Sequence, residues 1–283
     1  TDPSVVMPSN SITHRINGYN NHRAIISLNI ITGRYDRPGT AFPERDTYCH
    51  SDGGFISLEK EFIDAVRPRT SKPAVGTERF PLWKEMVDEG QGMALADQIL
   101  SGKPYELKAA ACFGVNHRMY PDSKRFLEAL DKLDFFFATD IFWTDVCNHA
   151  DLVLPVSTSF ERSEIKCYAG RFVNYTSPAI APVHNNRDDV EIITMLANAL
   201  DLDDPLLRQG YDACVKYIFS PSGIKDWEGL KKADGPVPAP NAKPYEFGSY
   251  LRKGPETPTG KLELYSEVVA KYKDKGLEPL PVY

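Results

Sequence analysis

Three short apolar runs between residues 107 and 156 are the clearest feature of the hydrophobic pattern. The runs Lys108–Phe113, Asp134–Ala138 and Asp151–Val156 are each too short for an ordinary helix, and turn-forming residues bound two of them. Between the first two runs, apolar residues recur at helical spacing within Ser123–Leu133. The order strand, helix, strand, short helix, strand predicts a parallel sheet with crossover helices.

Weaker apolar periodicity predicts further elements on both sides of this segment. Short strands are expected at Val5–Pro8 and Gly260–Ser266, and a β-prone piece at Arg171–Tyr175. Gly33 is placed to end the first helix, and Asp188 or Asp189 to cap the helix near residue 190. The expected helices are Tyr19–Thr32, Leu58–Val66, Pro81–Glu89, Met93–Leu100, Val190–Leu200, Pro205–Phe219 and Glu267–Lys275.

Together these elements predict an α/β fold of three layers, α/β/α, in which helices cover both faces of a mostly parallel sheet. We expect residues 1–105 to form a helical and loop segment that packs on the sheet domain. Residues 106–232 would be the α/β core, and residues 233–283 a linker followed by a strand and a helix. A chain of 283 residues fits one large domain or two ordinary ones.

Charge and cysteine spacing exclude several classes of protein. The net charge of −6 offers no basic field for nucleic acid or an acidic membrane. No apolar run approaches the roughly 20 residues that span a bilayer. None of the five cysteines forms a C-x-x-C pair, so we expect no disulfide framework, zinc site or iron–sulfur site within this chain. Cys49-His50 is the most ligand-like pair, but adjacent residues rarely both reach one metal.

In open parallel sheets, ligands sit beyond the carboxyl ends of the strands. Asn116 follows the first run, and its amide can both donate and accept; an ordinary turn is the alternative. Asp140 ends the second run and can accept hydrogen bonds from a guanine edge or a ribose, or instead cap the next helix. Arg162 can stack on a base or bind phosphate. Glu161 and Glu164 are either acid–base groups or partners of nearby cations.

No G-x-G-x-x-G or G-x-x-x-x-G-K-[ST] phosphate loop occurs, and no G-x-S-x-G elbow. The missing phosphate loop argues against a flavin- or nicotinamide-binding enzyme. The residues by themselves therefore indicate an α/β ligand-binding module, with a nucleotide-like ligand as one alternative.

The stretch ATDIFWTDVCNHADLVLPVSTSFERSEI closely resembles the molybdopterin oxidoreductases of the dimethyl-sulfoxide-reductase and formate-dehydrogenase superfamily. Further matches occur in the expected order. They are NGYNNHRAIISLNIITGRYDRPGT, GVNHRMYPDS (with His117 where Pro is usual), GRFVNYTSPAIAPVHNNRDDVEIITMLANAL and PTGKLELYS. This resemblance implies the fold of the family's central domain. It also implies a cofactor, molybdopterin guanine dinucleotide carrying molybdenum or tungsten.

Carried over residue by residue, the resemblance implies a set of contacts to one guanine-dinucleotide arm. Asp188 is an alternative if the alignment slips by one, and one further position lies where some members have a Gln near the pterin. The implied cofactor-binding residues are Asn116, Thr139, Asp140, Arg162 and Asp189, with His14 as that further position. The resemblance implies no catalytic residue and no metal ligand within this chain.

The family's iron–sulfur cysteines, its metal-binding residue and its C-terminal β-barrel have no counterpart in the sequence. We therefore expect the central portion of a larger prokaryotic enzyme, cytoplasmic or periplasmic, that is inactive by itself. Its expected partners are the N-terminal iron–sulfur domain and the C-terminal barrel of the parent, and electron-transfer subunits. The alternative is a non-catalytic scaffold or assembly module with the same fold.

Overall fold

The computed structural model describes residues 2–15, 17–41, 71–86, 89–168, 172–241 and 245–282. Its contacts group the chain into two compact units: Thr1–Tyr48 with Lys243–Tyr283, and Cys49–Ala242. The expected helix Leu58–Val66 and the Cys49-His50 pair lie outside the described residues. This grouping by contacts differs from the three segments expected from the sequence, 1–105, 106–232 and 233–283. Those segments stay a prediction.

The first unit is helical within its described residues, and the second combines helices with two sheets. The first contains α1 (Asn10–Thr13), α2 (Gly18–Ile31), α10 (Ser249–Lys253), α11 (Glu267–Ala270) and η8 (Lys273–Lys275). The helices of the second are α4 (Pro81–Met86), η3 (Gly92–Ala94), α5 (Leu95–Ser101), η4 (His117–Met119), α6 (Ser123–Leu130), η5 (Asp145–His149), α7 (Asp189–Ala199), η6 (Leu207–Gln209), α8 (Tyr211–Ile218), η7 (Ser220–Ser222) and α9 (Trp227–Lys232). Its strands are β1 (Ala109–Phe113), β2 (Phe135–Asp140), β3 (Leu152–Pro155), β4 (Glu164–Tyr168), β5 (Phe172–Thr176) and β6 (Val237–Pro238).

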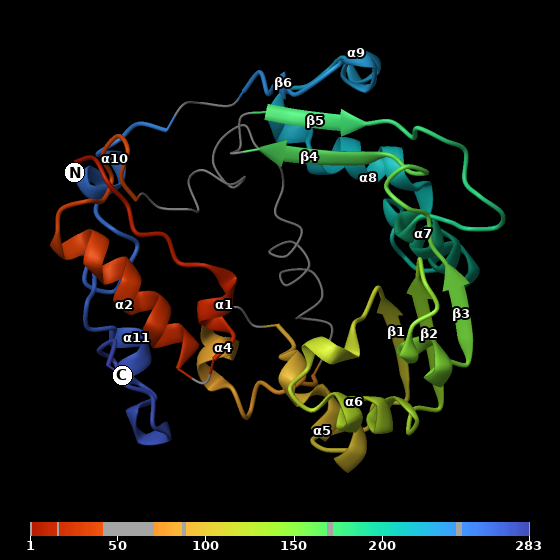
Figure 1. Ribbon diagram of the computed structural model, residues 1–283, viewed down its shortest axis with the longest axis horizontal. Coiled ribbons are helices and arrows are strands. Elements are labelled where there is room, and N and C mark those ends of the chain that lie inside the picture. The colour runs from red at the N-terminus through yellow and green to blue at the C-terminus, as the bar shows by residue number, and fades with distance from the viewer. Residues whose placement is uncertain are drawn as a thin grey trace. The chain divides into compact units, whose positions relative to one another are not determined.

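The three apolar runs form a parallel sheet of order β1-β2-β3, which confirms the predicted α/β fold. Figure 1 shows their arrowheads at the same end of the sheet. The core beside this sheet joins α6 to the strands through buried apolar side chains, namely Cys112, Phe126, Leu130, Phe136, Ala138 and Val146. Asp122 begins α6 by accepting a hydrogen bond from the backbone N of Arg125 over 3.1 Å.

A second sheet of three antiparallel strands has the order β4-β5-β6. The expected β-prone piece Arg171–Tyr175 corresponds to β5, the central strand. Figure 1 shows α8 beside this sheet. The buried side chains Val173, Val215 and Leu230 join β5 to α8 and α9 in a core of their own. This sheet follows the carboxyl end of β3 directly in the chain.

In the first unit, the predicted strand Val5–Pro8 is wrong, because the segment has no regular secondary structure and its backbone bonds to a side chain of α2. The backbone N of Val6 donates to Oδ1 of Asn29 over 2.9 Å, and Nδ2 of Asn29 donates to the carbonyl of Val6 over 2.8 Å. The buried amide of α2 thus replaces a neighbouring strand. The predicted end of α2 is confirmed: Gly33 has a φ of +65° and donates to the carbonyl of Ile30.

Three further expectations in the last third of the chain are corrected. Gly260–Ser266 is not a strand, because local polar contacts bend it; Oε1 of Glu263 accepts hydrogen bonds from both N and Oγ1 of Thr259. The single helix expected at Pro205–Phe219 is divided into η6 and α8 by Gly210, whose φ of +86° is incompatible with a continuous helix. The helix expected at Glu267–Lys275 is likewise two short pieces, α11 and η8.

Candidate functional site

Backbone hydrogen bonds bring four chain segments together at the carboxyl edge of the parallel sheet. The N of Gly114 donates to the carbonyl of Thr139 over 2.9 Å, which ties the end of β1 to β2. The N of Val156 donates to the carbonyl of Asp140 over 3.3 Å, and Val156 forms a parallel bridge with Arg187. The residues just beyond these positions therefore share one edge of the second unit.

A pocket of about 400 Å³ lies at this edge. Gly114, the first residue after β1, has a φ of +61°. Because a Cβ at this position would meet no atom within 4 Å, it is the backbone conformation of the turn, rather than lack of space, that favours glycine. The pocket is lined by Gly114, Val115, Asn116, His117, Arg118, Asp140, Trp143, Thr144 and Asp145. Two of the residues predicted from the sequence, Asn116 and Asp140, thus line the same pocket.

Both of these side chains keep one polar atom open. Oδ1 of Asn116 accepts from the backbone N of Arg118 over 3.1 Å, and Oδ1 of Asp140 accepts from the N of Phe142 over 3.2 Å. Within the described part of the chain, Nδ2 of Asn116 and Oδ2 of Asp140 make no hydrogen bond. The pocket therefore offers an amide donor and a carboxylate acceptor. The alternative interpretation of Asp140 as a cap for the residues directly after it is wrong, since the short helix expected between the second and third strands begins only at η5.

Thr139 lies next to Asp140 and is 1% exposed. Its Oγ1 is buried and has no hydrogen-bond partner among the described residues. A buried hydroxyl without a partner costs free energy, and such groups call for an explanation such as a ligand or a water.

The other polar residues of the pocket hold one another. Oδ2 of Asp145 accepts from a guanidinium nitrogen of Arg118 over 3.0 Å and lies 3.6 Å from Nε2 of the buried His117. Nε1 of Trp143 donates to Oδ1 of Asn148 over 2.7 Å. Sequence reasoning did not single out Arg118, Trp143 or Asp145, although each follows closely on a strand end.

Arg162 and Asp189, both predicted from the sequence, contact each other. Arg162 donates to Asp189 over 3.2 Å and to Glu164 over 3.0 Å. The hydrogen bond from Arg162 holds the pKa of Glu164 below its ordinary value. Asp188 instead caps α7 by accepting from the backbone N of Glu191 over 2.7 Å. Which of the two aspartates contacts a cofactor stays a prediction.

Glu161 is a structural acceptor. Its Oε2 accepts from both N and Oγ1 of Thr158, and its Oε1 accepts from N of Val183 and Nδ2 of Asn186, at 2.7–2.8 Å. These four bonds lower the pKa of the buried carboxyl to about 2. A carboxylate that is ionised and fully engaged in this way is a poor proton donor or acceptor near neutral pH.

The last predicted residue, His14, belongs to the first unit, where it is exposed at the end of α1. Its place near the pterin stays a prediction. In the described ranges, no group of three or more His, Cys, Asp or Glu residues is arranged to hold a metal ion. No helix within those ranges is both long and apolar enough to cross a membrane.

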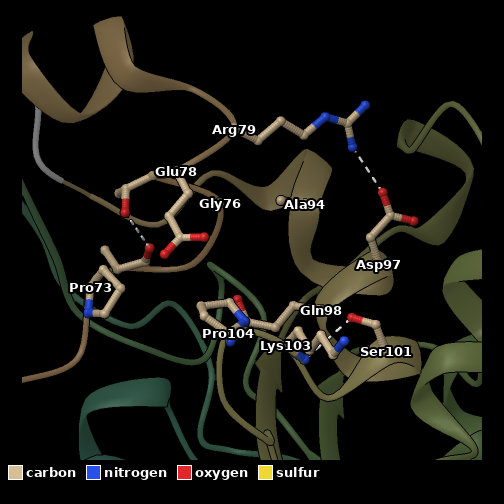
Figure 2. A pocket seen from close by; sticks show the side chains of 12 residues that line it. Pro73, Gly76, Glu78, Arg79, Ala94, Asp97, Gln98, Ser101, Lys103 and Pro104 are labelled. Carbon is tan, nitrogen blue, oxygen red and sulfur yellow. Dashed lines mark hydrogen bonds and ion pairs between the residues drawn. The ribbon is translucent and has the colours of Figure 1, made fainter.

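A second, smaller cavity of about 160 Å³ lies between the loop 73–79 and α5 (Figure 2). Arg79 and Asp97 form an ion pair of 2.8 Å beside it. Nε2 of Gln98 donates to the carbonyl of Tyr105, while its buried Oε1 has no partner among the described residues. The chain leaves this cavity at Pro104 and enters the amino end of β1, the end of the strand away from the pocket described above.

The sequence profile of the molybdopterin oxidoreductase family matches residues 2–199. The chain belongs to this family. Its curated relatives include a probable oxidoreductase of Bacillus subtilis, YoaE, which is 25% identical over 295 residues and covers 100% of this chain and 38% of that protein. Acetylene hydratase of Syntrophotalea acetylenica is 30% identical over 200 residues, which is 67% of this chain and 25% of that enzyme. The dimethyl sulfoxide/trimethylamine N-oxide reductase of Cereibacter sphaeroides is 29% identical over 56% of this chain and 22% of that enzyme.

The solved structure of acetylene hydratase from Pelobacter acetylenicus shares the fold. It superposes with a TM-score of 0.79 at 24% identity, over 100% of this chain and 40% of that chain. The chain therefore spans two fifths or less of the length of these relatives. Family membership implies a molybdopterin cofactor with molybdenum or tungsten.

Proposed function

We propose that the carboxyl edge of the parallel sheet binds the guanine end of a molybdopterin guanine dinucleotide in a larger molybdenum- or tungsten-dependent enzyme. The observation that carries the proposal is the pocket of about 400 Å³ that Asn116 and Asp140 both line, each with one polar side-chain atom that makes no hydrogen bond among the described residues. Its volume is within the range of about 300–1,000 Å³ that is typical of small-molecule sites.

The donor set of this pocket fits guanine. The base presents two donors, N1–H and the 2-amino group, which suit the open Oδ2 of Asp140. Its O6 is an acceptor that suits Nδ2 of Asn116. Thr139 is not among the residues that line this pocket; its buried, unpaired Oγ1 next to Asp140 is proposed as a further donor to the ligand.

Arg162 and Asp189 provide the second group of the proposed site. Asp189 begins α7 two residues after Arg187, whose bridge to Val156 places that turn at the same edge. A guanidinium binds phosphate oxygens in a bidentate way, and a carboxylate accepts from ribose hydroxyls. The cofactor would supply the redox or group-transfer chemistry, and these side chains would hold and orient it.

Under this proposal the remainder of the parent enzyme supplies the metal-binding residue, the iron–sulfur cluster, the closing barrel and any electron-transfer subunits. The chain itself holds one arm and does not turn over substrate. The relatives carry the names of reductases and of a hydratase, so the reaction is set by residues around the metal rather than by this edge.

Equilibrium dialysis of the purified chain with GDP and with ADP tests the proposal. GDP has the base and the phosphates of the cofactor tail, and we expect it to bind with one site per chain and at least about tenfold more tightly than ADP. Equal affinity for the two nucleotides, or no binding of either, would contradict the proposal. The scaffold role with the same fold would then be preferred.

A further inference from the structure

Trp143 is the largest side chain that lines the pocket at the carboxyl edge, and it is 70% exposed. Its indole has a hydrogen-bond partner, because Nε1 donates to Oδ1 of Asn148 over 2.7 Å. Thr144, the next residue, lines the same pocket, and Asn148 lies in η5 directly after it. An exposed aromatic ring that is anchored at its edge and lines a pocket presents a flat, pre-oriented face to a ligand.

The same pocket contains the two groups that suit the edge of a base, Asn116 and Asp140. Trp143 follows Asp140 by three residues, within the same turn. Recognition of an unpaired base generally combines hydrogen bonds to its edge with stacking of an aromatic ring on its face. The pocket offers both parts, and Trp143 is the one exposed aromatic side chain among its described lining residues, since His117 is buried.

We propose that Trp143 is the stacking surface for the purine base at this site and that Asn148 is its positioning residue. The inference rests on the proposed function and deepens it, because it assigns an aromatic side chain to the face of the base. Arg118 completes the arrangement. Its guanidinium is paired with Asp145 at 3.0 Å and lines the same pocket, and it offers the positive charge that suits the phosphates of a nucleotide.

Intrinsic fluorescence with GDP as the probe tests this inference, since the chain has three tryptophans. We expect GDP to quench the emission of the native chain. The control is Trp83→Phe, which should be quenched in the same way, because Trp83 does not line the pocket and its indole donates to the carbonyl of Glu89. Trp143→Phe should lose the quenching but bind GDP within about threefold of the native chain, because a phenyl ring still stacks. Trp143→Leu should bind about tenfold more weakly, as the loss of one base-stacking contact predicts.

Dialysis of the same proteins separates the two possible failures. If the native chain binds GDP and Trp143→Leu binds it equally well, the stacking role is wrong and the proposed function stands. If the native chain does not bind GDP, both are wrong. If GDP still quenches the emission of Trp143→Phe, the stacking role of Trp143 is wrong. Urea unfolding of each variant shows that it is folded, and Trp143→Phe supplies the decisive quenching result even if the leucine variant is unstable.

Discussion

Arg162 and Asp189, which are 27 residues apart in the chain, form an ion pair with a separation of 3.2 Å between nitrogen and oxygen. Glu164 accepts from the same guanidinium over 3.0 Å. Two side chains expected to bind a cofactor thus already stabilise each other. A phosphate that enters this site would share the guanidinium with the carboxylates, so the charge of Arg162 is held in place before any ligand arrives.

Replacement of Arg162 by alanine is expected to weaken GDP binding about tenfold, because a charge-assisted hydrogen bond to phosphate is lost. It also leaves Glu164 and Asp189 without their shared cation, at a cost of about 1 kcal/mol in the free energy of unfolding for partly exposed groups. The control is Arg79→Ala, which breaks an exposed ion pair beside the smaller cavity. Dialysis and urea unfolding check both effects, and equal GDP affinities of the two variants would speak against the role of Arg162.

Thr139→Val separates a binding role from a structural one. The substitution keeps the shape of a side chain that is 1% exposed and removes a hydroxyl that has no partner in the described structure. We expect unchanged or slightly higher stability, by up to about 1 kcal/mol, since no hydrogen bond is lost and an unpaired polar group is removed. If Oγ1 serves the ligand, GDP affinity falls about threefold to tenfold. A stability loss without any change in GDP affinity would assign Thr139 to the fold.

The pH dependence of stability should reveal Glu161. Its pKa is about 2 in the folded chain against an ordinary value of 4.5, because four hydrogen bonds favour the ionised form. The unfolded chain therefore binds more protons between these two values, and the stabilisation is complete above about pH 4.5 and is lost as the pH falls toward 2. Glu161→Gln should be less stable at pH 7, because an amide NH₂ cannot accept from the donors that face it.

The diagnostic readout is the slope of unfolding free energy against pH. From pH 4.5 down to pH 2, the glutamine variant should show a shallower slope, with up to one proton fewer taken up on unfolding. Parallel slopes for the two proteins would mean that Glu161 is not the titrating group.

In the first unit, Asp36 connects two distant segments of the chain. The side chain accepts from the hydroxyl of Tyr245 and from the backbone N of Gly248 and Leu251, at 2.7–3.0 Å. Burial by itself would raise the pKa of Asp36, but the hydrogen bonds outweigh it and lower the pKa. Asp36→Asn should cost about 1–3 kcal/mol of unfolding free energy, because an NH₂ group then faces a buried donor.

Asparagine tolerates the positive φ of 57° at this position, so the variant tests the hydrogen bonds rather than the backbone. Tyr245→Phe is the matched variant that removes one donor, with an expected loss of about 1 kcal/mol. If the urea midpoint of Asp36→Asn equals that of the native chain, the hydrogen bonds of Asp36 do not stabilise this unit.

The strands of the parallel sheet were predictable to within one or two residues, because short apolar runs without helical periodicity are typical of buried strands. The antiparallel sheet was half missed. Its β4 carries the inward pair Ile165 and Cys167 at alternate positions, but only over a few residues and beside several charges. The false strand at Val5–Pro8 shows the opposite error, since an extended segment can satisfy its backbone with a side chain such as Asn29.

For the site, the sequence indicated which residues follow strand ends but not how they meet. That Asn116 and Asp140 line one pocket follows from the parallel register, which local pattern does predict. The pairing of Arg162 with Asp189 depends on how the turn before α7 returns to the sheet, and no periodicity encodes that return. Trp143 looked like one aromatic residue among several until its exposure was known.

Base discrimination by Asp140 is the most direct test of the central claim that this edge reads guanine. Xanthine carries an oxygen where guanine carries its 2-amino group, so an acceptor prefers guanine and an amide donor prefers xanthine. Asp140→Asn keeps the oxygen that accepts from Phe142 and offers an NH₂ in place of the open oxygen. Dialysis of both proteins with GDP and XDP should show at least about a tenfold preference for GDP in the native chain and a preference for XDP in the variant. The same order of preference in both proteins would contradict the claim.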